Sequence, residues 1–391
     1  MTSRALNWTA YLFMAGQGYL LYVVGFITPY LQSDLGVPPW IAALPNSMMA
    51  LGILSAGLYA KRVTGRIGPR NAARLWAALM AVSGVLLAIP ITIVPILLGA
   101  FAFGTSVVGM LVHVISAFGG RDDAKQLVRA YLWAMVGAVA GPLVLSAAAR
   151  SVGWSFGALM PVPFLVLLVF VLPASPARDR VVGDGARESS LPRAYWLTWI
   201  FLVLCMGAEF SIVAWGAQVA TARAGLSAAD ATGLASLYVL GMILGRLALS
   251  TGLGSRPSNG SVLRGCAGLA LAGAVALWVA TAPPLAGIGL FVAGLGMSGI
   301  MPLGSILALA HAPYAPIRAS ARLTAAMGVA VFAAPLVLGF VSGSVGVLGA
   351  WSLVFALLAV GQLVLFGIPR PPSAEHEPVE PEVPAWRARG L

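Results

Sequence analysis

The chain has 391 residues, of which 60% are hydrophobic and 9% are charged, and its mean hydropathy is +0.93. An ordinary soluble domain has about 25% charged residues, so this composition excludes a soluble globular protein and indicates one that lies largely in a membrane. The net charge of +11 does not indicate nucleic-acid binding, because the basic residues are spread between apolar segments rather than gathered in one domain.

Apolar segments of about 20 residues, the length that one membrane-spanning helix needs, predict an all-α membrane protein with twelve transmembrane helices. In chain order, the predicted spans are 8–31, 40–60, 72–90, 94–117, 128–149, 154–172, 195–220, 229–250, 262–281, 285–310, 321–342 and 348–368.

The hydropathy pattern is repeated along the chain. Residues 75–117 contain no Asp, Glu, Lys or Arg, and neither do residues 265–310, and each stretch is broken by prolines near its middle. A duplicated set of helices is how many secondary transporters are built, with the substrate site between the copies. The predicted domains are an N-terminal six-helix bundle (1–172), a cytoplasmic linker (173–194), a C-terminal six-helix bundle (195–368) and a disordered cytoplasmic tail (369–391).

Basic residues gather in every second loop, which predicts the orientation of the chain. One side holds Lys61, Arg62, Arg66, Arg70, Arg74, Arg121, Lys125, Arg129, Arg178, Arg180, Arg187, Arg193, Arg256, Arg264, Arg318 and Arg322, and the other holds only Arg150 and Arg223. By the positive-inside rule, we expect a multi-pass protein of the cytoplasmic (inner) membrane with both termini in the cytoplasm.

Small residues four apart occur next to a proline in the fifth predicted span, as Gly137-x-x-x-Gly141-Pro142. Ala330-x-x-x-Ala334-Pro335 occupies the matching place in the eleventh span. Such a pattern lets helices approach closely, and the proline bends or loosens the helix. One interpretation is generic helix packing. The other is a tight, bent contact between the halves that takes part in the conformational cycle.

With these features, the chain resembles the major facilitator superfamily from about residue 8 to 368. The loop after the second span carries part of the resemblance, because Arg66, Gly68 and Arg70 match the basic loop of that family. Gly65 stands where the family has an Asp that helps to gate the cytoplasmic side, so the resemblance implies a gate that is built differently here.

The pattern from Gly137 to Pro142 is similar to a span-five motif of family members that act as antiporters, usually drug exporters. Leu145 and Ser146 replace two glycines that the motif has after the proline. Such exporters often carry a membrane-embedded Arg in span four, and none occurs between Pro95 and Ala117.

Glu209 is predicted to carry the proton coupling. It is the one acidic residue of twelve that lies deep in a predicted span, roughly 20 Å from Tyr195 at about 1.5 Å per residue. Placing a carboxylate at that depth costs about 2.5–3.5 kcal/mol of insertion free energy, so the side chain should face a cavity or a partner. Burial also favours the protonated form of a carboxyl group. The alternative is a neutral Glu with a structural hydrogen bond. In some states Glu209 would instead bind a cationic substrate.

Four further residues within the spans are candidates. Arg246 lies close to the predicted cytoplasmic face, where it would hold the cytoplasmic helix ends together or snorkel to the interface; binding a substrate anion is the alternative. Gln17, Asn46 and Trp215 are predicted substrate contacts, although polar residues in spans often only join helices.

The sequence therefore predicts a non-enzymatic secondary transporter that works by alternating access, with a small molecule, protons and the lipid bilayer as partners. Export of an amphipathic or hydrophobic compound in exchange for protons is the first hypothesis. Proton-coupled or facilitated uptake of a small organic solute is the second, and a membrane sensor that transports nothing is the third. We expect the protein to be a monomer. We also expect no cofactor and no metal, because no metal-ligand or nucleophile motif occurs.

Overall fold

The computed structural model describes residues 3–117, 124–171, 191–250, 259–312 and 315–369. Within these residues the regular secondary structure is helical throughout, which confirms the predicted all-α membrane fold. The predicted linker and tail lie almost entirely outside the described residues.

The first group of helices comes from the N-terminal part of the chain and packs mainly within itself, with the closest pairings between α1 and α6, α3 and α5, and α4 and α5. Its members are α1 (Ser3–Phe26), α2 (Thr28–Leu35), α3 (Pro39–Ile67), α4 (Pro69–Leu87), α5 (Ile93–Ala117), α6 (Ala124–Ser151), α7 (Trp154–Leu159) and α8 (Val162–Val171). These segments are apolar around most of their circumference, because in a bilayer each helix must satisfy its backbone internally and face lipid or another helix.

The second group repeats this scheme, and its main pairings are α12 with α13, α11 with α13, and α9 with α15 and α16. Its members are α9 (Arg193–Ala224), α10 (Ala228–Leu234), α11 (Ser236–Ala248), α12 (Asn259–Val279), α13 (Pro283–Met297), α14 (Ile300–Ala310), α15 (Pro316–Ala350) and α16 (Ser352–Phe366). The α15 helix contains a break at Gly346, whose φ of 73° is a backbone conformation that suits glycine.

Ten of the described helical stretches are long and apolar enough to cross a membrane, and α16 is a shorter apolar helix. The α4 helix, with 19 residues, packs against α5 and α8. Together these elements are consistent with the twelve predicted spans. Several spans are made of two consecutive helices, such as α10 with α11 and α13 with α14.

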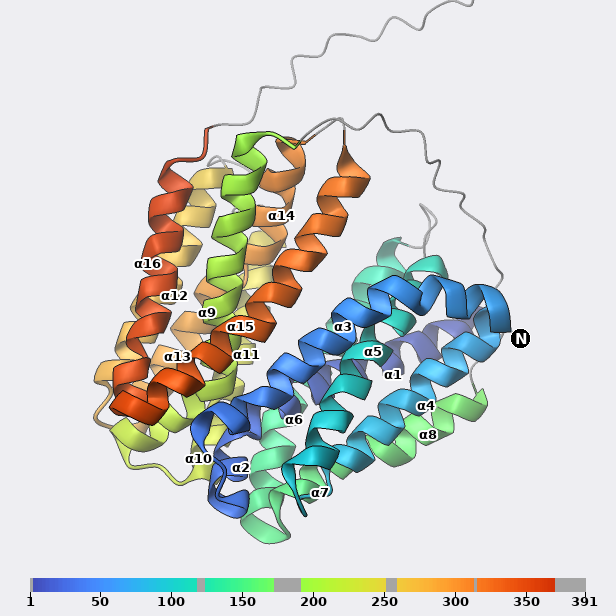
Figure 1. Cartoon of the computed structure of the whole chain (residues 1–391), viewed down its shortest axis with the longest axis horizontal. Coiled ribbons are helices and arrows are strands. Elements are labelled where there is room, and N and C mark those ends of the chain that lie inside the picture. The colour runs from blue at the N-terminus through green and yellow to red at the C-terminus, as the bar shows by residue number, and fades with distance from the viewer. Residues whose placement is uncertain (1–2, 118–123, 172–190, 251–258, 313–314, 370–391) are drawn as a thin grey trace, which may run out of the picture.

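The two groups lie side by side and run at an angle to each other (Figure 1). We call the end that contains α2, α7 and α10 the α10 end, and the opposite end, where α1 begins and α16 ends, the termini end. The groups meet at the α10 end and diverge toward the termini end (Figure 1). Between the groups, the most extensive contact joins α3 to α15.

Polar contacts between the groups gather at the α10 end. The Tyr30 hydroxyl lies 3.0 Å from the Thr232 hydroxyl, and the Ser146 hydroxyl donates to the Ala229 carbonyl at 2.7 Å. Arg150 forms an ion pair with Asp230. Further toward the middle, the Ser47 hydroxyl donates to the Phe332 carbonyl at 2.8 Å. The described polar contacts therefore hold the groups together most densely at the α10 end. Further contacts between the groups join Tyr22 of α1 to Met242 of α11 and Met135 of α6 to Arg246 of α11.

Candidate functional site

Glu209 lies at the middle of α9, a helix of the second group that also contacts α1 of the first group. Its side chain is 8% exposed, and its neighbours along the chain are almost all apolar and buried. In the described part of the chain, no hydrogen bond or ion pair engages its carboxylate. A buried carboxylate without such partners has its charge stabilised only by longer-range interactions.

The side chains that interact electrostatically with Glu209 come from both groups of helices. Tyr22 on α1 and Tyr238 on α11 each interact electrostatically with Glu209, and both side chains are buried. The Tyr22 hydroxyl lies 3.3 Å from the Met242 sulfur, whereas the fully buried Tyr238 hydroxyl has no hydrogen-bond partner among the described residues. Burying a hydroxyl without a hydrogen-bond partner costs free energy, so we expect a water or ligand to hydrogen-bond to it.

Arg246 brings a positive charge to the same region. Its guanidinium interacts electrostatically with Glu209, and its Nη1 lies 3.2 Å from the sulfur of Met135 on α6. Tyr238, Met242 and Arg246 are each four residues apart and so lie along one face of α11. Counted from the α10 end at about 1.5 Å per residue, Glu209 and Arg246 lie roughly 22 and 27 Å along their helices, about one turn apart.

These residues form what we call the central cluster. Its members are Tyr22, Met135, Glu209, Tyr238, Met242 and Arg246. The cluster combines one acidic and one basic side chain that are not ion-paired with each other in the described residues. Its residues are drawn from α1, α6, α9 and α11, so any relative movement of the two groups changes the surroundings of both charges.

The three predicted substrate contacts have no described contact with the central cluster. Gln17 on α1 and Asn46 on α3 each hold buried amide atoms without a hydrogen-bond partner in the described chain, and the Asn46 side chain is fully buried. The fully buried Trp215 indole donates to the Pro335 carbonyl on α15 at 3.1 Å. Trp215 therefore joins α9 to α15 inside the second group, whereas the two amides still need partners.

The predicted gating loop lies at the termini end, between α3 and α4. Gly68 has a φ of 80°, a backbone conformation that favours glycine over residues with a side chain. Its amide donates to the Thr64 carbonyl at 3.0 Å. Arg66 and Arg70 on either side are exposed. Among the described residues, no hydrogen bond or ion pair connects this loop to the second group.

The prediction that Gly137 and Gly141 form a contact between the halves is wrong. Both glycines face α1, a helix of the same group: a Cβ at Gly137 would overlap the Ala15 carbonyl oxygen, and one at Gly141 would lie 2.9 Å from the Tyr19 carbonyl oxygen. Gly18 on α1 packs in the same way against α6. The pattern, with Pro142 inside α6, therefore builds a close seam within the first group.

We expect Gly137→Ala to destabilise the protein by about 1–3 kcal/mol, because the new methyl group overlaps backbone that cannot rotate away. Gly57→Ala on α3 is the matched control, since nothing lies within 4 Å of its added Cβ. Thermal denaturation in detergent measures the difference. Equal stability of the two variants would contradict the close α1–α6 seam.

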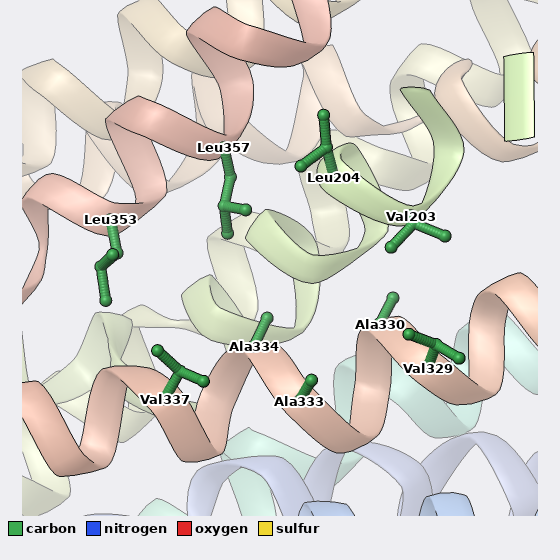
Figure 2. A pocket seen from close by; sticks show the side chains of 9 residues that line it. All are labelled: Val203, Leu204, Val329, Ala330, Ala333, Ala334, Val337, Leu353 and Leu357. Atoms are coloured by element: carbon green, nitrogen blue, oxygen red, sulfur yellow. The ribbon is translucent and has the colours of Figure 1, made fainter. Parts of the chain in front are cut away.

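The matching seam in the second group borders an apolar pocket of about 190 Å³ between α9, α15 and α16 (Figure 2). Its lining residues are Val203, Leu204, Val329, Ala330, Ala333, Ala334, Val337, Leu353 and Leu357. Val203 and Leu204 lie on roughly the opposite face of α9 from Glu209 at about 100° per residue. The pocket is therefore separate from the central cluster, and its lining side chains offer no polar group to a substrate.

Comparison with known proteins agrees with this architecture. The sequence pattern of the Major Facilitator Superfamily matches residues 8–316. The chain belongs to this superfamily. A comparison with curated protein sequences found no match. As a superfamily member, the chain is a multi-pass membrane transporter.

Solved structures of transporters share the fold of this superfamily member at low sequence identity. A mutant of the nucleoside transporter NupG matches with a TM-score of 0.74 and 14% identity over 93% of this chain and 99% of that one. A bacterial homolog of the human lysosomal transporter Spinster, in an inward-facing and unoccupied conformation, matches with a TM-score of 0.74 and 11% identity over 94% and 98%. A mutant of the peptide transporter POT matches with a TM-score of 0.71 and 15% identity over 92% and 93%.

Sequence reasoning missed Tyr22, Tyr238, Met242 and Met135 of the central cluster. Tyrosine and methionine are ordinary in apolar segments, so their presence gives no signal. The spacing of Tyr238, Met242 and Arg246 would have indicated that one face of this superfamily member's α11 leads from Arg246 toward the middle of the membrane.

Proposed function

We propose that this protein is a secondary active transporter that moves a small organic compound by alternating access, with Glu209 taking up and releasing the coupling proton. The observation that carries the proposal is the position of Glu209, a buried acid that interacts electrostatically with both groups of helices. The other acids in the described residues, Asp34 and Asp230, lie at the α10 end and have partners in Trp154 and Arg150.

The arrangement of the two groups supports alternating access. The groups are joined at the α10 end by the contacts of Tyr30, Ser146 and Arg150, and they diverge at the termini end (Figure 1). If the termini end is cytoplasmic, this is an inward-facing state. The proposal takes the transporter as a monomer of the inner membrane with both termini in the cytoplasm.

Two directions of coupling are compatible with this scheme. Export of an amphipathic compound in exchange for protons is the direction that the span-five motif favours, but its glycines pack within one group. The central cluster favours the second candidate, proton-linked uptake of a polar solute, because it contains a guanidinium, two tyrosine hydroxyls and a carboxylate.

Flux measurements in liposomes test the proposal. The purified chain would be reconstituted with an enclosed pH-sensitive dye, and compounds that are neutral, cationic or anionic would be added in separate pools. We expect at least one pool to move protons across the membrane only in liposomes that contain the protein. Transport that is unaffected by an imposed pH gradient for every pool would contradict proton coupling.

The proposed orientation predicts the labelling of two exposed positions in a background in which Cys205 and Cys266 are replaced by Ala. Asn71→Cys, at the termini end, should react with a membrane-impermeant maleimide only from the cytoplasmic side. Ser151→Cys, at the α10 end, should react only from outside. The reverse labelling would invert the topology, and the structure would then be open to the outside.

A further inference from the structure

We propose that Arg246 binds a carboxylate of the transported compound and that this binding promotes proton uptake by Glu209, so that the substrate is a small organic anion that crosses together with a proton. The inference rests on the proposed function and deepens it, because it names the substrate class and the direction of coupling.

Arg246 is a guanidinium in need of an acceptor. It is half-buried, and its one hydrogen bond in the described residues goes to the Met135 sulfur, which is a weak acceptor. Among the other basic side chains, Arg150 pairs with Asp230, whereas Arg223 lies 4.5 Å from the Trp278 ring centroid and its Nε has no hydrogen-bond partner in the described residues. Five donors in a planar fork fit a carboxylate in two parallel hydrogen bonds.

The surroundings of Arg246 suit a small organic anion. Met135 and Met242 offer flexible, polarizable walls, and the Tyr238 hydroxyl, unpartnered in the described residues, is a second hydrogen-bonding group on the same face of α11. The Tyr22 hydroxyl, now against the Met242 sulfur, is a further donor from the other group of helices. A carboxylate can accept from these hydroxyls while its carbon skeleton contacts the methionines.

The two charges couple substrate and proton. In the present state the positive charge of Arg246 interacts with Glu209, and the two side chains form no ion pair in the described residues. The negative charge of an anion bound to Arg246 offsets that positive charge, so Glu209 gains a proton more readily. By linkage, protonation of Glu209 then strengthens anion binding by the same factor.

The same argument gives the opposite sign for a cationic substrate. A cation that binds the Glu209 carboxylate directly competes with the proton, which yields exchange rather than movement in one direction. The sign of the coupling therefore distinguishes the two substrate classes even before the transported compound has been identified.

No other charge near Glu209 changes this balance in the described residues. The one charged side chain that interacts with it is Arg246 on α11, and the neutral ionisable side chains that do so are Tyr22 on α1, Cys205 on α9 and Tyr238 on α11. The remaining ionisable side chains on the helices that pack against α9 have no described interaction with Glu209; they are Tyr11, Tyr19, Tyr30, Asp34, Asp230, Arg264, Cys266, His311 and Arg322.

Calorimetry on the purified full chain, with lactate, benzoate and succinate as probes, tests the inference. Titrations in two buffers of different ionisation enthalpy give the number of protons taken up per anion bound, and the expected value is close to one. Benzylamine and benzamide serve as cationic and neutral counterparts. Arg246→Gln should weaken carboxylate binding at least about tenfold, and Arg246→Lys by less, because a single ammonium keeps the charge but not the fork.

Arg264→Gln is the matched control, because Arg264 is also half-buried but lies at the termini end and interacts with Ser261. It should leave both affinity and proton uptake unchanged. Proton release on binding of benzylamine, with no carboxylate binding, would overturn the anion inference and leave the proposed function intact. Proton-linked carboxylate binding of unchanged affinity in Arg246→Gln would also overturn it. If no probe class moves protons in liposomes, the proposed function fails as well.

Discussion

Replacing Glu209 by Gln is expected to lower the accumulation of substrate that a pH gradient drives by a factor of about 100 or more. Gln keeps the size and hydrogen-bonding capacity of the side chain but stays neutral, so it cannot exchange a proton during the cycle. Passive exchange of substrate down its own gradient should persist in part, because the helices and the rest of the central cluster are unchanged. The measurement is substrate flux in liposomes as a function of the pH on each side.

Glu209→Asp is the informative control, because the shorter acid still titrates and should retain coupled transport with a shifted pH dependence. Arg246→Gln should change affinity or rate while the flux remains dependent on pH, since Glu209 is still present. Full pH-driven accumulation by Glu209→Gln would make Glu209 structural. No other acid in the described spans lies near the middle of the membrane to take its place.

A disulfide between cysteines introduced at Ser146 and Ala229 is expected to stop transport almost completely. The Ser146 hydroxyl lies 2.7 Å from the Ala229 carbonyl, across the junction of the two groups at the α10 end. Alternating access requires this junction to separate in every cycle, so a covalent bond across it traps one state. Flux should be lost after oxidation and recovered after reduction with dithiothreitol.

The single variants Ser146→Cys and Ala229→Cys, in the background without Cys205 and Cys266, are the controls for this experiment. Each should transport equally well before and after oxidation. If the oxidised double variant formed the disulfide quantitatively and still transported at the rate of the single variants, the α10 end would not open during transport, and the alternating-access proposal would fail.

The course of the chain could be predicted because each span depends on a local property. A bilayer demands about 20 apolar residues per helix, and that length is visible without tertiary information. The predicted span 195–220 lies within α9, and the predicted break near Pro283 coincides with the start of α13. Glu209 stands out for the same reason, since a charge in an apolar span needs no structural context to be noticed.

The surroundings of Glu209 could not be predicted, because they depend on how helices far apart in the sequence rotate toward one another. Counting depth along the helices places Arg246 about one turn from Glu209, but only the packing of the helices shows that the two charges interact. The glycine pattern of Gly137 and Gly141 correctly indicates a close helix contact. It carries no information about which helix is the partner, and that partner is α1.

The seam between α1 and α6 and the seam between α9 and α15 are copies of one element, but they differ in compliance. Glycines bring α1 and α6 into backbone contact, so this pair resists any sliding or tilting. Alanines at the corresponding places leave a pocket of about 190 Å³ beside α9 and α15, which can yield without a steric clash. During the transport cycle, the helices of the second group should therefore shift relative to one another, whereas those of the first group should move as a rigid body.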